Sequence, residues 1–331
     1  MMFSKVCIYG VGAIGGWMGA RVGQLAGVQL SLVARGDTLR ALQQHGLRLH
    51  SAGATHTVAA QASSDPAELG VQDLVVVAVK APALPEVARH MAPLIGPHTA
   101  VLTAMNGVPW WFLQQFGGAY ANTALRSVDA DGHIARAIPA QHVLGGVVHA
   151  SCSLRAPGEV DHHFGNGLIV GEPSGNLSAR GQALQALLAE AGFDASLSPS
   201  IQKDVWYKLW GNMSVNPVSA LTGATTDKIM DDPLVRSFIS SVMLEAKAIG
   251  ARIGLAIEQQ PEDRHAVTRK LGAFKTSMLQ DVQAHRAVEL DALVGAVREL
   301  GQITGVATPF TDALMGLARL QAQGLGLYPA T

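Results

Sequence analysis

A glycine-rich turn directly after a short apolar strand is the feature that most restricts how this chain folds. Residues 5–9 (KVCIY) predict a buried strand, and a helix is expected over 13–25. The first glycine of the turn allows a tight bend, the second lets a pyrophosphate approach the backbone, and the third permits close helix–strand packing. Because a helix N-terminus also favours anions, the turn predicts a dinucleotide site. Its expected cofactor-binding residues are Gly10, Gly12, Ala13, Ile14 and Gly15.

The end of the second predicted strand, 29–33, indicates which dinucleotide is bound. NAD and FAD binders usually carry an acidic residue here for the ribose hydroxyls, whereas this chain continues with Ala34 and Arg35. A guanidinium pairs with phosphate oxygens, so Arg35 favours the 2′-phosphate of NADPH. Asp37, an acidic residue, lies close by and leaves NADH as an alternative cofactor. The other alternative is that Arg35 is a surface arginine without a function.

The pattern of apolar runs predicts the fold class and two domains. Apolar runs at 74–79 and 100–104, joined by helical connectors, are typical of a parallel sheet covered on both faces. The fold class is therefore an α/β Rossmann domain with a doubly wound, mostly parallel sheet, ended by an antiparallel pair within 143–170. Residues 45–56 read as loop-rich. From Ser198, an expected N-cap before Pro199, helical periodicity dominates. We expect an NADP-binding domain over 1–195 and an all-helical substrate and catalytic domain over 196–331.

Charge and composition exclude several classes of partner. The chain has 24 Lys and Arg against 25 Asp and Glu, so its net charge of −1 gives no footprint for nucleic acid or an anionic membrane. The run 74–79 is too short to span a bilayer. Two distant cysteines predict neither a disulfide scaffold nor a zinc site, and His162 and His163 would point to opposite faces of a strand. We expect a cytoplasmic protein without a metal, and a homodimer is left open.

One predicted helix carries an unusual polar face. Lys208, Asn212 and Asn216 are spaced four residues apart, so they drift only about 40° per step and share one side. An amine with two carboxamides suits a cavity for a small oxygenated ligand. A solvated polar stripe is the alternative interpretation.

Further polar residues follow the predicted strands and late helices. Lys80 follows the run 74–79, and Asn106 follows 100–104, where the carboxyl ends of parallel strands meet the ligand crevice. A snorkelling lysine and a plain Asn-Gly turn are the alternatives. Ser277 and Glu289 lie among apolar helical neighbours. Glu289 has a functional role only if its carboxylate faces Lys208, because it would then keep the amine protonated and charged.

Taken together, these motifs resemble the ketopantoate reductase (2-dehydropantoate 2-reductase) family, in order and over nearly the whole chain. The resemblance rests on the glycine turn, Arg35, Lys80, Asn106-Gly107, the segment 206–217, the segment 277–281 and Glu289-x-Asp291. It implies a Rossmann domain and a helical domain related to the 6-phosphogluconate dehydrogenase superfamily. It also implies reduction of a 2-oxo acid to a 2-hydroxy acid with NADPH, in pantothenate biosynthesis for the true ketopantoate enzymes.

The same resemblance assigns roles to residues. Lys208 looks like the general acid that protonates the developing alkoxide, and Glu289 looks like its partner. The expected substrate-binding residues are Asn106, Asn212, Asn216 and Ser277, with Asn106 and Lys80 at the junction of nicotinamide and substrate. Since hydride delivery builds negative charge on the carbonyl oxygen, a positioned ammonium both stabilises that charge and supplies the proton. A second cation or amide donors must then hold the substrate carboxylate.

The stretch of about 108–142 looks like an insertion relative to compact members of that family. It includes Pro109-Trp110-Trp111-Phe112, which would either shape the substrate pocket or pack between domains. A different 2-oxo acid is therefore the main alternative substrate. A non-catalytic NADPH-sensing regulator would have no reason to retain Lys208 and its polar neighbours, and Arg35 speaks against an S-adenosylmethionine methyltransferase.

Overall fold

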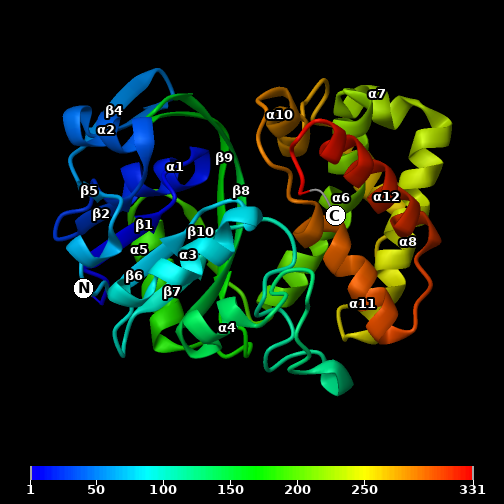
Figure 1. The fold of residues 1–331 in the computed structure, drawn as a ribbon, viewed down its shortest axis with the longest axis horizontal. Helices are drawn as coiled ribbons and strands as arrows, with labels where there is room; N and C mark the ends of the chain where they lie inside the picture. Colours follow the sequence, from blue (N-terminus) through cyan, green and yellow to red (C-terminus); the bar gives the residue numbers. More distant parts are fainter. Residues whose placement is uncertain (1, 330–331) are drawn as a thin grey trace. The chain divides into compact units, whose positions relative to one another are not determined.

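The computed structural model describes residues 2–329, which divide into two compact units (Figure 1). The first unit contains the chain up to Met105 and then Gly132–Asp204. The second unit contains Asn106–Asp131 and the chain from Val205 onward. These units differ from the expected division at residue 195, because the segment 106–131 belongs with the helical part.

The first unit is built on a single ten-stranded sheet with the order β4-β3-β9-β8-β7-β6-β1-β2-β5, and β10 pairs with β9. Most neighbouring strands are parallel, and only β3–β4 and β8–β9 are antiparallel. The strands are β1 (Lys5–Tyr9), β2 (Gln29–Val33), β3 (Leu47–Ser51), β4 (Ala54–Val58), β5 (Gln61–Ser63), β6 (Leu74–Val77), β7 (Ala100–Thr103), β8 (Val143–Ala156), β9 (Glu159–Gly171) and β10 (Asp194–Leu197). The mostly parallel sheet and its antiparallel pair confirm the predicted fold class.

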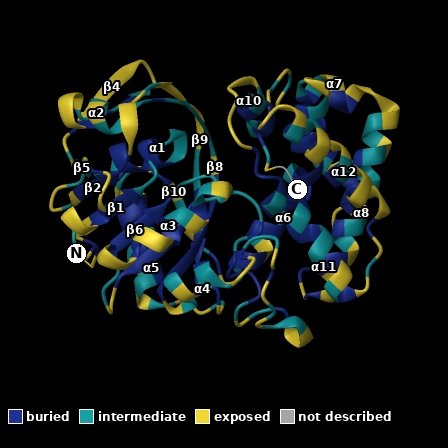
Figure 2. Ribbon diagram, in the orientation of Figure 1, coloured by how far each residue is buried: buried dark blue, intermediate teal, exposed yellow. Residues whose placement is uncertain are grey.

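Strand β1 is an interior strand of the sheet and pairs with β2 on one side and β6 on the other. Ile8 lies opposite Leu32 of β2 and Val76 of β6, and all three are buried. Figure 2 shows these strands as a buried layer. The helices of this unit are α1 (Ala13–Val22), α2 (Gly36–His45), α3 (Leu84–His90), α4 (His133–Ala137) and α5 (Ala179–Glu190). Helix α1 ends earlier than expected, with Gly23 as its C-cap.

The region expected to be loop-rich is instead the hairpin β3–β4. Leu47 and Leu49 are buried while Arg48 and His50 between and beyond them are not, which is the two-residue alternation of a strand. The short lengths of these strands hid that alternation. Beyond β10, the Ser198 amide still donates to the Val170 carbonyl of β9, so the chain leaves the sheet late and the next helix begins at Ile201 rather than Pro199.

The second unit is helical. It contains most of α6 (Ile201–Thr222), followed by α7 (Thr226–Asp231), α8 (Pro233–Arg252), α9 (Pro261–Arg269), α10 (Ser277–Gln283), the π-helical turn η6 (Asp291–Gly295), α11 (Ala296–Thr304) and α12 (Pro309–Gly324). Trp206, Trp210 and Met213 of α6 are buried, and the Trp210 indole donates to the Met243 carbonyl of α8 over 2.7 Å. Helix α6 is therefore the central helix of this unit, as its apolar residues predict.

The segment 106–131 joins this helical unit through backbone and ring contacts. The Val108 amide donates to the Ala292 carbonyl of η6 over 2.8 Å. The amides of Arg126 and Ser127 donate to the Glu299 carboxylate of α11 over 2.7 and 2.8 Å. The ring of Phe112 lies 5.9 Å from that of Trp206. A loop that follows a strand of the sheet thus supplies part of the helical core.

The described residues contain no cluster of three or more side chains suited to a metal ion. None of their helices is both long and apolar enough to cross a membrane. Both cysteines, Cys7 and Cys152, are free thiols, and burial raises the pKa of each to about 12. Neither thiol is therefore a nucleophile at neutral pH.

Candidate active site

The glycine turn between β1 and α1 leaves space where a dinucleotide needs it. Gly10 has a φ of +98°, and a Cβ there would lie 2.5 Å from Val79 Cγ1. A Cβ on Gly15 would lie 2.1 Å from the Gly10 carbonyl oxygen, so the turn and the helix need glycine at both positions. A Cβ on Gly12, the N-cap of α1, would meet nothing within 4 Å. The open N-terminus of α1 therefore fits a pyrophosphate.

Arg35 lies beside this turn, at the carboxyl end of β2 and the start of α2. Its Nη1 lies 2.5 Å from Glu86 Oε1 of α3, and the two side chains are 66% and 46% exposed. A guanidinium this accessible can bind a phosphate group. In this structure it pairs with the carboxylate of Glu86 instead. Lys80 follows β6, as predicted, and lies in this same unit.

In the helical unit, the lysine of α6 meets the asparagine that follows β7. Lys208 Nζ donates a hydrogen bond of 2.8 Å to Asn106 Oδ1. The contact is possible because Asn106 begins the segment that packs with the helical unit. Two residues that the sequence assigns to the same site, 102 positions apart, are therefore in direct contact.

The environment of Lys208 changes its proton affinity. The pKa of the ammonium is lowered from 10.5 to about 8, mainly by burial and also by the positive charge of Arg264, while the carboxylate of Glu289 acts in the opposite direction. Glu289 is itself only 5% exposed. The expectation that Glu289 acts on Lys208 thus has electrostatic support, and the amine is left with a pKa suited to proton transfer near neutral pH.

Two more of the predicted residues approach each other. Asn216 Nδ2 lies 3.5 Å from Ser277 Oγ, at the first residue of α10. Asn216 is buried, whereas Asn212 is half-buried one turn closer to Lys208. The polar face predicted for α6 therefore extends from the buried Asn216 through the half-buried Asn212 to Lys208.

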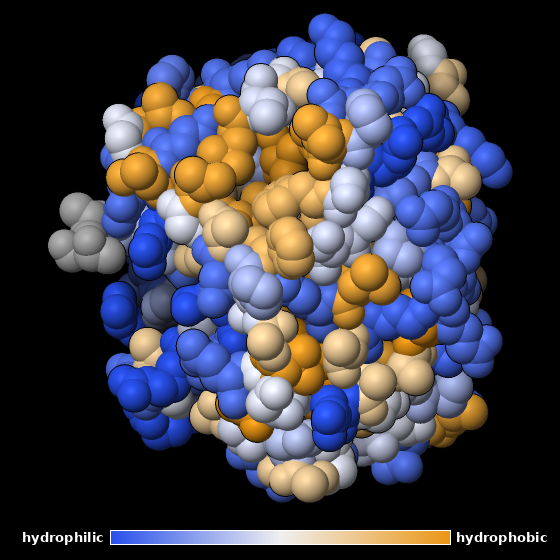
Figure 3. Space-filling model, turned by 90° about the vertical axis from the view of Figure 1, so that its right-hand side faces the viewer, coloured by the Kyte–Doolittle hydropathy of each residue, from blue (hydrophilic) through white to orange (hydrophobic). Residues whose placement is uncertain are grey.

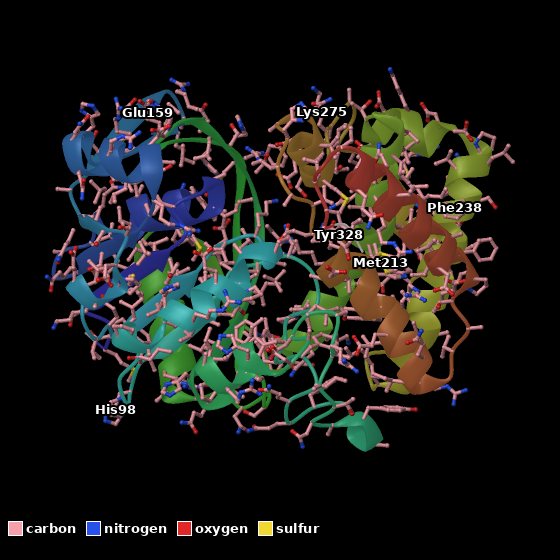
Figure 4. All side chains as sticks on the ribbon, viewed as in Figure 1. His98, Glu159, Met213, Phe238, Lys275 and Tyr328 are labelled. Carbon is pink, nitrogen blue, oxygen red and sulfur yellow. The ribbon has the colours of Figure 1, made fainter. Side chains whose placement is uncertain are left out.

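A π-helical turn connects the loop of Asn106 with the chain near Glu289. Gly107 has a φ of +86°, and a Cβ there would lie 2.7 Å from the Ala292 carbonyl oxygen of η6. The Tyr328 hydroxyl donates over 2.6 Å to Asp291 Oδ1 at the start of η6, so the end of the chain also holds this turn (Figure 4). Irregular helical turns of this kind are frequent at functional sites.

Arg264 is a residue that the sequence analysis did not single out. It lies on α9, and its guanidinium carbon is 5.6 Å from the ring centroid of Tyr207 on α6. A Cβ on Gly211 would lie 2.6 Å from Arg264 Nε, so the glycine makes room for the guanidinium. The signal in the sequence was this glycine, which is unfavourable in the middle of a helix unless close packing requires it.

A dinucleotide turn on a mostly parallel sheet and a half-buried lysine among carboxamides define the chain as an oxidoreductase of the nicotinamide-dependent class. The family models described as "Ketopantoate reductase PanE/ApbA" and its C-terminal part match residues 6–175 and 200–322. A 2-dehydropantoate 2-reductase of Mesorhizobium japonicum is 42% identical, covering 98% of this chain and 99% of the relative. The chain belongs to the ketopantoate reductase family.

Solved structures agree with this assignment. A protein from Ralstonia solanacearum MolK2, described as a candidate ketopantoate reductase, is 56% identical and superimposes with a TM-score of 0.95 over 98% of this chain and 100% of its own. A family ketopantoate reductase from Ralstonia eutropha JMP134 is 26% identical, with a TM-score of 0.83 over 97% of this chain and 99% of its own. The family predicted from the sequence motifs is confirmed.

Proposed function

We propose that this NADP-dependent oxidoreductase reduces 2-dehydropantoate to pantoate with NADPH. The observation that carries the proposal is the half-buried Lys208 ammonium, which shares a helix face with Asn212 and Asn216 and donates a hydrogen bond to Asn106. Reduction of a 2-oxo acid needs such a cation next to the carbonyl oxygen, since negative charge develops there. Mesorhizobium japonicum carries a relative named for this reaction.

The chemistry divides between the cofactor and the side chains. NADPH, when bound, supplies the hydride for the carbonyl carbon. Lys208 stabilises the charge on the carbonyl oxygen and gives it a proton, and a pKa of about 8 leaves most of the amine protonated at pH 7. Asn106 orients the ammonium by accepting a hydrogen bond from it. The negative charge of Glu289 favours the protonated amine.

The remaining polar residues bind the substrate in this proposal. Asn212, Asn216 and Ser277 offer carboxamide and hydroxyl groups to the oxygen atoms of the 2-oxo acid. The proximity of Asn216 and Ser277 supports a shared role for them.

The first unit binds the cofactor in this proposal. Gly10, Gly12, Ala13, Ile14 and Gly15 form the pyrophosphate turn. Arg35 binds the 2′-phosphate, and Lys80 lies at the nicotinamide end. The fit of the turn to a pyrophosphate supports the first of these assignments.

The decisive test is the rate of NADPH oxidation with 2-dehydropantoate and a panel of other 2-oxo acids. A kcat/KM of roughly 10⁴ M⁻¹s⁻¹ or more for 2-dehydropantoate supports the proposal, since it falls in the usual range for enzymes. A faster rate with another branched or aromatic 2-oxo acid keeps the mechanism and changes the substrate. Tight NADPH binding without turnover of any acid favours the sensor interpretation.

We further propose a cytoplasmic homodimer. Two free cysteines suit a reducing compartment. Helices α8 and α12 expose Leu234, Leu317 and Leu320 to 81%, 60% and 69%. The space-filling view shows apolar side chains gathered on the face that it draws (Figure 3). Light scattering after size exclusion measures the mass directly. A dimer that the double variant Leu317→Glu, Leu320→Lys converts to a monomer supports this surface, and a wild-type monomer refutes it.

A further inference from the structure

The guanidinium of Arg264 occupies a prepared place beside the central helix of the helical unit. Its carbon lies over the ring of Tyr207 at 5.6 Å. Its Nε and Nη2 would stand 2.6 and 3.0 Å from a Cβ on Gly211, so any larger residue there would displace it. These two α6 residues immediately precede Lys208 and Asn212. The guanidinium is therefore held against α6 about 100° around the helix axis from the face that carries Lys208 and Asn212, next to the predicted site.

This guanidinium has no anionic partner among residues 2–329. Its Nε is buried without a hydrogen bond, and its guanidinium carbon lies over the ring of Tyr207. Other arginines of the same unit differ: Arg269 pairs with Asp231, Arg286 with Asp281 and Arg298 with Asp312. Burying an N–H donor of a cation without a hydrogen-bond acceptor costs free energy. An anionic ligand that accepts a hydrogen bond from the guanidinium would remove this cost.

Arg264 also lies within electrostatic reach of Lys208, whose pKa it lowers. Two cations of the protein, Lys208 and Arg264, thus act on the same region, together with the Glu289 carboxylate. The 2-oxo acid of the proposed reaction carries its carboxylate on the carbon next to the reacting carbonyl. A pair of cations matches that arrangement, one for the carbonyl oxygen and one for the carboxylate.

We propose that Arg264 binds the carboxylate of the 2-oxo acid and so makes the enzyme selective for acids over their neutral derivatives. The inference rests on the proposed function. A guanidinium presents parallel N–H donors that fit a carboxylate in two-pronged fashion, whereas an ammonium acts as a point charge. Lys208 is then left to the carbonyl oxygen, where the proton is needed.

The test compares a 2-oxo acid with its methyl ester in the full-length enzyme. Arg264→Gln is expected to lower kcat/KM for the acid by about ten- to a hundred-fold, mainly through KM, because charge-assisted hydrogen bonds are lost. The rate with the ester should stay within about twofold of the wild type. Arg264→Lys should recover only part of the loss, since the fork is missing.

Two further variants separate binding from folding. Gly211→Ala keeps the arginine but pushes its guanidinium aside, so it should also reduce the preference for the acid. Arg269→Gln, on the same helix and paired with Asp231, is the matched control and should leave the preference unchanged. Equal losses for acid and ester in Arg264→Gln, or no loss for either, would overturn the inference.

Failure of the proposed function is distinguishable from failure of this inference. If the wild type reduces no 2-oxo acid, oxalate is titrated calorimetrically into the NADP⁺-saturated protein as a carboxylate probe. Binding by the wild type that Arg264→Gln weakens tenfold or more retains the anion site. Equal binding by both, or no binding by the wild type, refutes it.

Discussion

Lys208 donates a hydrogen bond of 2.8 Å to Asn106, and this contact links helix α6 to the loop that follows β7. In the same loop, the Val108 amide donates to the Ala292 carbonyl of η6, a turn that begins two residues beyond Glu289. The hydrogen-bond acceptor of the ammonium is therefore tied through the backbone to the chain next to its electrostatic partner. A site preorganised in this way is what general acid catalysis requires.

Removing the Lys208 ammonium should lower turnover strongly and leave NADPH binding nearly unchanged. Lys208→Ala is expected to reduce kcat by about 10²–10⁴-fold, because both proton transfer and charge stabilisation are lost. The dissociation constant for NADPH, measured by fluorescence, should change by less than about threefold. The exposed Lys203 on the same helix is the control, and Lys203→Ala should behave like the wild type. Near-normal turnover of Lys208→Ala would remove this residue from the role of acid.

The pKa of Lys208 predicts a pH profile. Reduction needs the protonated amine, so kcat/KM should be high below about pH 8 and fall tenfold per pH unit above it. Glu289 raises this pKa, so Glu289→Gln should move the descending limb to lower pH, and Arg264→Gln should move it to higher pH. Profiles of the three proteins that descend at the same pH would contradict the electrostatic coupling.

The ion pair at the cofactor turn predicts two variants with opposite effects. Arg35→Ala should weaken NADPH by about tenfold and leave NADH nearly unchanged, since only NADPH carries the 2′-phosphate. Glu86→Gln removes the carboxylate that pairs with Arg35 and should strengthen NADPH binding. Fluorescence titration with both cofactors measures the ratio. Equal weakening of both cofactors in Arg35→Ala would refute the phosphate contact.

The close approach of Gly107 to Ala292 predicts a coupled loss of stability and activity. Gly107→Ala adds a Cβ 2.7 Å from the Ala292 carbonyl oxygen at a φ of +86°, which should cost about 2 kcal/mol or more in the free energy of unfolding. Because Asn106 is adjacent, kcat should fall as well. Urea unfolding and turnover measure both effects.

The control for that variant is Gly118→Ala. Gly118 has a φ of +57°, but a Cβ there would meet nothing within 4 Å. It should lose only the smaller cost of the left-handed conformation and keep its kcat. If both variants behave alike, the contact with Ala292 is not what constrains the loop.

Much of this protein could be predicted from local patterns. The glycine turn, the strands β1 and β2 and the position of Arg35 lie close together in sequence, and their spacing reports their geometry directly. The face of α6 was predictable for the same reason, since helical periodicity places Lys208, Asn212 and Asn216 together. The hairpin β3–β4 was missed because five-residue strands carry little periodicity, and β4 is exposed except at Val58.

Three relationships depended on contacts between distant segments. The segment 106–131 follows a strand of the sheet, yet its buried rings and amides pack with the helical unit, and no local pattern indicated this. Arg264 resembles any surface arginine until its packing over Tyr207 and Gly211 is seen. The effect of Glu289 on Lys208 likewise requires the two elements to be placed in space.

The sequence by itself therefore determined the fold class, the dinucleotide turn and the chemical types present at the site, because these follow from periodicity and from residues near one another along the chain. Only the tertiary structure decided which of those groups meet and what charge each carries. Burial set the pKa of Lys208 near 8, the packing of residues 106–131 brought Asn106 to it, and the absence of a side chain at Gly211 left room for Arg264. Desolvation and close packing are properties of the assembled core, which no single segment contains.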